Sequence, residues 1–150
     1  MDKLTIKGLI VKKLNIIPTK KGDVLHMLRN DDNTFKSFGE CYFSEVNPGC
    51  IKGWKKHYKQ NQFFSVPIGR LKLVLFDDRK TSKTYKKVDE IILGRPDSYF
   101  RISIPPGIYY SFKCLTKNPT LIVNCTDIPH SVDESLALDL DNYTIPYKWD

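Results

Sequence analysis

Short apolar runs separated by turn residues follow one another along the chain. In most of these runs apolar and polar residues alternate, which is the period of a β-strand with one buried face. Clusters of Asn, Asp, Pro and Gly mark turns between them, at residues 30–33, 47–49, 94–97 and 105–107. The pattern predicts extended segments at residues 4–17 (one strand or a pair), 35–46, 51–58, 63–67, 71–77, 88–93, 99–104, 108–115 and 120–125.

A short helix is expected only within residues 131–140, where Asp133 and Glu134 would lie in its first turn. Short strands spaced roughly 8 to 12 residues apart favour an all-β fold, either an antiparallel sandwich or a barrel. A jelly-roll barrel matches the size of the chain. The 150 residues are also about the size of one domain with one core, so we expect residues 1–150 to form a single domain.

Lysines interrupt every apolar run in residues 1–17, which leaves no signal peptide and no membrane-spanning segment there. We therefore expect a cytoplasmic protein without a membrane partner. In that compartment cysteines are normally reduced, and no Cys-x-x-Cys pair occurs. We expect free thiols at Cys41, Cys50, Cys114 and Cys125.

The chain carries a net charge of +7, from 24 Lys and Arg against 17 Asp and Glu. Such a positive charge is compatible with binding to nucleic acid, to an anionic membrane surface or to a phosphorylated small ligand, and it is also compatible with a role in solubility alone. Basic residues gather at 52–59 and 79–87, and residues 127–150 are acidic. No nucleic-acid-binding motif accompanies the basic clusters, and aromatic and basic residues do not alternate as on an OB-fold sheet. We expect no nucleic-acid partner.

Two spaced motifs carry the strongest fold signal. Gly49 is followed by five residues, the triplet 55–57 (Lys-Lys-His), four residues, Gln62, six residues and Gly69. A second stretch, residues 105–110, reads Pro-Pro-Gly-Ile-Tyr-Tyr. The first spacing resembles the Gly, His-x-His, Glu, Gly motif of the cupin family, and the second resembles its Pro-x-Gly-x-x-His motif. The resemblance implies a cupin jelly-roll barrel.

Metal-binding cupins place three His and one Glu where this chain has Lys55, His57, Gln62 and Tyr110. A divalent ion needs three or four imidazole or carboxylate ligands, and only His57 qualifies among these side chains. The comparison with the motif therefore predicts no metal ion, and we expect no other cofactor.

Among metal-free cupins, the chain resembles the dTDP-4-dehydrorhamnose 3,5-epimerases. Residues 49–55, Gly-Cys-Ile-Lys-Gly-Trp-Lys, resemble their Gly-Val-Leu-Arg-Gly-Leu-His, and residues 104–112 resemble their Ile-Pro-x-Gly-Phe-Ala-His-Gly-Phe. Further similarities lie at 77–79, 124–127 and 145–147, so that the resemblance covers roughly residues 40 to 150. It implies a nucleotide-sugar epimerase or isomerase that acts next to the ketone of an NDP-4-keto-6-deoxy sugar in surface polysaccharide synthesis.

Such an epimerase removes a proton next to the ketone and returns it to the opposite face, which requires a base, an acid and a cation for the enolate. By resemblance, the family's base His maps onto Lys55 and its acid Tyr onto Val123. An unperturbed lysine has a pKa of ~10.4 and an unperturbed histidine one of ~6.5, so a histidine is the better base near neutral pH. We expect His57 as base, Lys55 as cation and Tyr110 as acid.

Other polar side chains are candidates for binding the substrate. Regular alternation puts Lys52 on the strand face opposite Lys55, so a binding role for Lys52 requires a bulge. Arg101 alternates with apolar residues, and a cation inside the barrel would need an anionic partner. The complete set of binding candidates is Lys52, Lys59, Gln62, Lys72, Arg101 and Asn124.

Each candidate also has a purely structural explanation: the lysines as a solvated strand, His57 as a hydrogen-bonded histidine, and Tyr110 as core. Because the family's base and acid are replaced, single-centre epimerisation and ketoisomerisation are as open as double epimerisation. The rival from another class is a non-catalytic cupin that binds a sugar nucleotide or glycan as a binding or scaffold protein. Relatives of this kind pair edge strands in homodimers, so we expect a homodimer.

Overall fold

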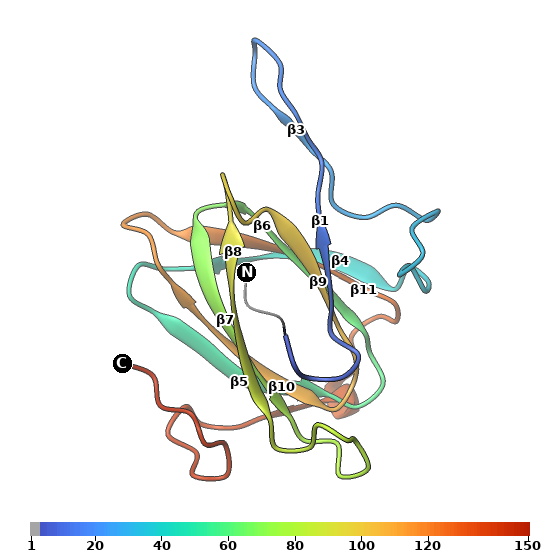
Figure 1. Cartoon of the computed structure of the whole chain (residues 1–150), viewed down its shortest axis with the longest axis vertical. Helices are drawn as coiled ribbons and strands as arrows, with labels where there is room; N and C mark the ends of the chain where they lie inside the picture. The colour runs from blue at the N-terminus through green and yellow to red at the C-terminus, as the bar shows by residue number, and fades with distance from the viewer. Residues whose placement is uncertain (1–3) are drawn as a thin grey trace.

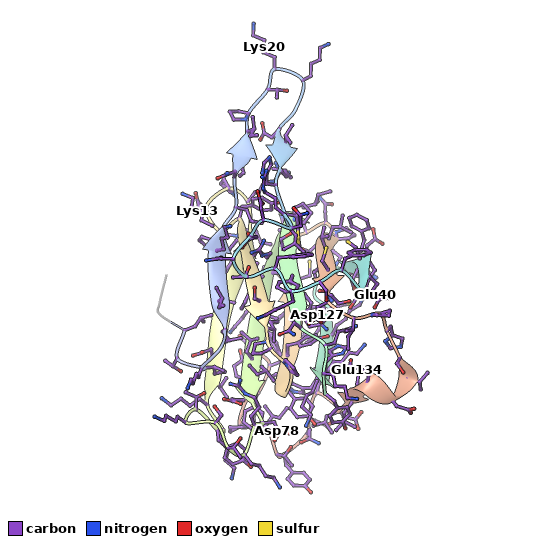
Figure 2. The ribbon with its side chains drawn as sticks, turned by 90° about the vertical axis from the view of Figure 1, so that its right-hand side faces the viewer. Lys13, Lys20, Glu40, Asp78, Asp127 and Glu134 are labelled. Carbon is purple, nitrogen blue, oxygen red and sulfur yellow. The ribbon has the colours of Figure 1, made fainter. Side chains whose placement is uncertain are left out.

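The structure is a computed structural model that describes residues 4–150. It consists of antiparallel strands in two facing five-stranded sheets and one small hairpin (Figure 1). The first sheet has the order β1 (Ile10–Lys13), β9 (Phe100–Ile104), β6 (Gln62–Ile68), β11 (Thr120–Thr126), β4 (Glu40–Val46). The second has the order β12 (Ser135–Ala137), β5 (Ile51–His57), β10 (Ile108–Cys114), β7 (Arg70–Asp77), β8 (Val88–Gly94). The hairpin of β2 (Ile16–Ile17) and β3 (Val24–Leu25) projects from one end, with Lys20 near its tip (Figures 1 and 2).

The main core lies between the two sheets, where every second residue of a strand points inward. On β7 these residues are Leu71, Leu73 and Leu75, and on β10 they include Tyr110 and Phe112. Burial of these side chains against the opposite sheet is the main stabilising contribution. The expected all-β jelly roll is confirmed, and the predicted strands are found with two differences. Residues 4–17 contain β1 and β2, and only the second part of 35–46 is a strand.

A second, smaller cluster covers the outer face of the second sheet. Trp54, Phe76 and Tyr109 pack there against Ile145 of the C-terminal tail. The indole nitrogen of Trp149 donates a hydrogen bond of 2.7 Å to the Ser111 hydroxyl, which ties the end of the tail to β10. The tail thus takes the place of a further layer on this face, and it leaves the cavity side of β5 and β10 open.

The expected helix within residues 131–140 is wrong. The segment forms one 3-10 turn, Val132–Glu134, and then continues as β12, which pairs with the end of β5. Glu134 is the reason, because its carboxylate accepts hydrogen bonds from the backbone amides of Lys59 and Gln60 just beyond β5. These bonds and the β12 pairing satisfy the backbone of both segments in an extended arrangement. No helix in residues 4–150 has the length and apolar character that crossing a membrane requires.

Strand β5 contains a bulge, which is the irregularity that Lys52 needs in order to face the same side as Lys55. Tyr110 pairs with Lys55, but Ser111 pairs with Gly53, so that one additional residue of β5, Trp54, is accommodated between them. Gly53 has φ +125°, and a Cβ atom there would lie 2.6 Å from the Ser111 Cβ and 2.8 Å from the Tyr110 carbonyl oxygen. The bulge changes the alternation of β5, and it brings Lys52 to the same side as Lys55.

Replacement of Gly53 tests how much the structure depends on this bulge. We expect Gly53→Ala to lower the free energy of unfolding by about 2 to 4 kcal/mol, because strain at positive φ adds to a clash with β10. Gly22→Ala is the matched control, since Gly22 has φ +126° but nothing within 4 Å of the added Cβ atom. Gly22→Ala should lower the free energy of unfolding by no more than about 1 to 2 kcal/mol. Urea unfolding measures both, and equal losses would contradict the role of the close approach.

Candidate active site

A cavity of about 250 Å³ opens between the two sheets. Its walls combine apolar side chains with lysine, tyrosine and asparagine side chains. This composition is typical of a site that binds a small polar ligand, in which a few polar groups fix the orientation. The first sheet contributes Tyr42, Ser44, Phe64, Ile122 and Asn124, and the second contributes Lys52, Gly53, Lys55, Tyr110 and Phe112.

A chain of hydrogen bonds runs from a buried carboxylate to the wall of the cavity. The Glu134 Oε2 atom lies 2.6 Å from the His57 Nδ1 atom, and the His57 Nε2 atom lies 3.0 Å from the Tyr110 hydroxyl oxygen. The other oxygen of Glu134 accepts the backbone amides of Lys59 at 2.6 Å and Gln60 at 2.8 Å. The turn that carries Glu134 lies beside the strands (Figure 2). Both carboxylate oxygens are therefore fixed, and they in turn fix the imidazole ring.

Burial and neighbouring charges set the protonation of this chain. Burial lowers the pKa of His57 below its usual value, the charge of Lys55 lowers it further, and the bond to Glu134 offsets only part of this. Burial alone would raise the pKa of Glu134, but the bonds from His57 and two backbone amides outweigh it and lower that pKa. A charged Glu134 requires the proton of neutral His57 to be on Nδ1. The Nε2 atom then accepts the Tyr110 hydroxyl.

Tyr110 separates His57 from the cavity. His57 is only 3% exposed and does not line the cavity, whereas Tyr110 does. Burial raises the pKa of Tyr110 well above its usual value, and the nearby Tyr42 and Glu134 act in the same direction. Tyr110 therefore keeps its proton in the resting protein and donates it to His57.

A second hydrogen-bonded chain forms the opposite wall. The Asn124 amide nitrogen donates to the Tyr42 hydroxyl oxygen at 2.8 Å and to Gln62 at 2.5 Å. Gln62 donates to Gln60 at 2.5 Å, and Gln60 donates to the Ile128 carbonyl oxygen. Of the expected binding residues, Asn124 lines the cavity and Gln62 lies directly behind it. The amides hold Tyr42 in place.

Two lysines reach the cavity from β5. The Lys52 Nζ atom donates to the Ser44 hydroxyl at 3.1 Å, which links the second sheet to the first. Lys55 also lines the cavity, and no carboxylate among the described residues forms an ion pair with it. Its ammonium group is therefore available to an anionic or carbonyl oxygen of a ligand.

Three expected binding residues lie elsewhere. Lys59 is exposed in the turn after β5, and only its backbone is used, by Glu134. Lys72 points away from the core, because it alternates with the inward-facing leucines of β7. Its Nζ atom lies 2.8 Å from Glu90 and faces the aromatic rings of the C-terminal tail. Lys59 and Lys72, both expected from the sequence to bind the substrate, therefore do not line this cavity.

Arg101 is buried, but outside the barrel. The neighbouring Ile102 and Ile104 occupy the core, so the same alternation turns Arg101 to the outer face of the first sheet. There it lies beneath residues 26–34, donates to the Met27 carbonyl oxygen at 3.0 Å, and lies 3.0 Å from a carboxylate oxygen of Asp32. The anionic partner that a buried cation needs is thus a residue of the chain itself.

Two residues of the site, Tyr42 and Glu134, were not predicted from the sequence. Tyr42 precedes both cupin motifs, and only its pairing with Asn124 across β4 and β11 brings it to the cavity. Glu134 stood out only as an acidic residue in a possible first helical turn. Neither position carries a spacing signal, because each joins the site through a partner far away in the sequence.

The described residues offer no ready set of metal ligands. In residues 4–150 no group of three or more His, Cys, Asp or Glu side chains is arranged so that it could hold a metal ion. Of the four positions that hold ligands in metal-binding cupins, His57 has both nitrogen atoms engaged, by Glu134 and by Tyr110. The groups present are suited to binding a carbonyl or phosphate oxygen and to moving a proton.

Comparison with known proteins places this chain in a family. The sequence model described as dTDP-4-dehydrorhamnose 3,5-epimerase matches residues 3–150. The spore coat polysaccharide biosynthesis protein SpsL of Bacillus subtilis is 30% identical over 146 residues, which is 96% of each chain. A probable low-salt glycan biosynthesis epimerase of Haloferax volcanii is 27% identical over 91% of this chain and 85% of its own length.

Solved structures agree with this assignment. The crystal structure of a dTDP sugar isomerase from Desulfovibrio desulfuricans is 44% identical, with a TM-score of 0.94 over 96% of this chain and 92% of its own. A dTDP-4-dehydrorhamnose 3,5-epimerase from Bacillus anthracis, at 19% identity and a TM-score of 0.85 over 98% of this chain and 87% of its own, shares the fold. The full-length match to the family model and the 30% identity to SpsL both lead to the same conclusion. This chain belongs to the dTDP-4-dehydrorhamnose 3,5-epimerase family.

Proposed function

We propose that this protein is a metal-independent nucleotide-sugar epimerase of polysaccharide biosynthesis, acting next to the ketone of an NDP-4-keto-6-deoxy sugar. The observation that carries the proposal is the chain from Glu134 through His57 to Tyr110, which ends at a cavity also lined by Lys55. The names of the relatives support the substrate class, since one is a dTDP sugar isomerase and another acts in spore coat polysaccharide biosynthesis.

Proton removal is the first step of the proposed reaction. The C–H bond next to the ketone breaks as its proton moves to the Tyr110 oxygen, while the Tyr110 hydroxyl proton moves to the Nε2 atom of His57. The imidazolium that forms is stabilised by Glu134. Because the two transfers are coupled, a buried phenolate, which burial makes costly, does not accumulate. On this proposal His57 acts through Tyr110 rather than on the sugar itself, and Tyr110 accepts the sugar proton instead of serving as the acid that the sequence suggested.

The electron pair of the C–H bond moves toward the ketone, whose oxygen becomes an enolate. Lys55 lies on the cavity wall with its ammonium group available, and it stabilises this oxygen. A single such donor typically contributes about 10² to 10³-fold in rate. Lys52, at the same side of β5, then binds the pyrophosphate of the nucleotide, with Asn124 and Gln62 ordering the opposite wall.

Exchange of ring protons with solvent tests this function. A panel of dTDP-, UDP- and GDP-linked 4-keto-6-deoxy sugars is incubated with the protein in deuterated water and followed by NMR. We expect exchange next to the ketone, and a loss of about 10² to 10⁴-fold in Tyr110→Phe. Lys72→Met, which alters a lysine outside the cavity, is the control and should leave the rate unchanged.

Two other outcomes would contradict the proposal. If no proton exchanges but the same nucleotide sugars raise the melting temperature, the protein is a non-catalytic cupin that binds them. If the ligands neither exchange nor bind, the assignment to nucleotide sugars itself is wrong.

The pH dependence of exchange tests the relay role of His57. His57 must be neutral to accept the proton, and its pKa lies below the usual value of 6.5, so activity should be full near pH 7 and fall only as the pH drops below about 6.5. Glu134→Gln removes a group that raises this pKa. It should move the acidic limb to still lower pH and also slow the reaction. NMR titration of the imidazole measures the pKa directly, and a midpoint above 6.5 in the unaltered protein would contradict the assignment.

We also propose that residues 1–150 form one cupin domain and that two copies pair through β4. This strand is an edge of its sheet, and its Phe43 is 67% exposed. An exposed edge with an apolar side chain is stabilised by pairing with another chain. The cytoplasmic location expected from the sequence stays a prediction.

Light scattering tests the dimer. We expect a particle of twice the chain mass, and we expect Phe43→Asp to shift it toward the monomer because a charge would enter the interface. Tyr143→Asp alters a side chain that is 95% exposed in the C-terminal tail and should leave the mass unchanged. A monomeric mass for the unaltered protein at high concentration would contradict the proposal.

A further inference from the structure

We infer that Tyr42 is the catalytic acid of this enzyme, and that it delivers a proton to the face of the sugar carbon opposite to Tyr110. The inference rests on the proposed function and adds its stereochemical outcome, which is inversion by two phenols on opposite walls. The sequence gives no such role to Tyr42, since the residue lies outside every motif.

The first argument is the placement of the two phenols. Tyr42 belongs to β4 of the first sheet and Tyr110 to β10 of the second, and both line the cavity between the sheets. They are close enough that the charge of an ionised Tyr42 would raise the pKa of Tyr110. We place the flat enolate between the two sheets, with one phenol on each of its faces.

The second argument is the direction of the hydrogen bonds. Tyr110 donates its hydroxyl proton to His57, which leaves the lone pairs of its oxygen for a proton from the sugar. Tyr42 is bonded in the opposite sense, because its oxygen accepts the amide of Asn124 and its own proton is not used in that bond. The same functional group is thus prepared as an acceptor on one wall and as a donor on the other.

The environment of Tyr42 suits an acid. Burial raises its pKa, so it holds its proton until the enolate forms. Once the proton has left, the amide of Asn124 stabilises the phenolate, and Gln62 fixes the orientation of that amide. Tyr42 is 37% exposed, which allows it to regain a proton from water after each reaction.

The acid position of the family does not provide an alternative. By resemblance this position is Val123, which has no proton to donate. Ile122 and Asn124 on either side of it line the cavity, so Val123 points away from it. Tyr42, on the neighbouring strand β4, is the phenol that the first sheet presents to the ligand.

The protons balance over one reaction. The enolate carbon takes the Tyr42 proton on its second face, and the electron pair returns from oxygen to form the new C–H bond. Tyr42 is left as a phenolate and His57 as an imidazolium. After the product leaves, Tyr42 takes one proton from water, and the Tyr110–His57 pair releases one.

Proton exchange and inversion can be measured separately, which tests the inference. A 4-keto-6-deoxy sugar linked to dTDP, UDP or GDP is again incubated with the protein in deuterated water. NMR then measures both the deuterium content and the configuration of the sugar carbon. The unaltered protein should give inverted product that carries deuterium. Tyr42→Phe should lose inversion by about 10² to 10⁴-fold while deuterium still enters the sugar with its configuration retained. Tyr110→Phe should lose both.

Controls keep these outcomes distinct. Tyr143→Phe removes an exposed phenol from the tail and should change neither rate, and an unchanged shift of melting temperature by dTDP verifies that Tyr42→Phe folds and binds. Inversion by Tyr42→Phe at the unaltered rate would overturn the role of Tyr42 but leave the proposed function intact. So would exchange without inversion in the unaltered protein, or loss of exchange together with inversion in Tyr42→Phe. Absence of exchange in the unaltered protein would instead be the failure of the proposed function.

Discussion

The buried carboxylate of Glu134 is the interaction on which the site depends. A charge withdrawn from water is costly unless it is fully hydrogen-bonded, and Glu134 meets that condition with two backbone amides and one imidazole. Those three bonds hold the end of β5, the turn beyond it and the segment that leads into β12. They also decide on which nitrogen atom His57 carries its proton, and so what Tyr110 can do at the cavity.

A second constraint is the bulge in β5. Without it, strict alternation would place Lys52 and Lys55 on opposite faces of the strand, and one cation would be lost from the cavity. The close approach of Gly53 to Ser111 leaves no room for a side chain, while Trp54 is turned outward into the cluster under the C-terminal tail. The bulge therefore brings Lys52 to the cavity and at the same time turns Trp54 into the cluster on the outer face.

The replacements relative to the family's motifs fit a redistribution of roles. Where the resemblance expects a histidine base the chain has Lys55, which lines the cavity and on our proposal stabilises the enolate. His57 lies behind Tyr110, and on our proposal Tyr42 supplies the missing acid from a different strand. Such a change of roles is possible because a jelly roll brings side chains of several strands to one cavity. The chemical role of a side chain then depends on where it lies in the cavity and not on its place in the sequence.

The sequence by itself determined most of the strands, the jelly roll and much of one wall of the cavity, since alternation and motif spacing are local properties of the chain. The alternation along β10 also accounts for Tyr110 facing inward and Tyr109 facing outward. Only the tertiary structure decided which cations reach the cavity. Lys72 and Arg101 follow the alternation of their strands away from it, and each is held there by a carboxylate from another segment. Glu134 and Tyr42 joined the site for the same reason, because contacts between strands far apart in sequence depend on register and on a bulge, which no local pattern specifies.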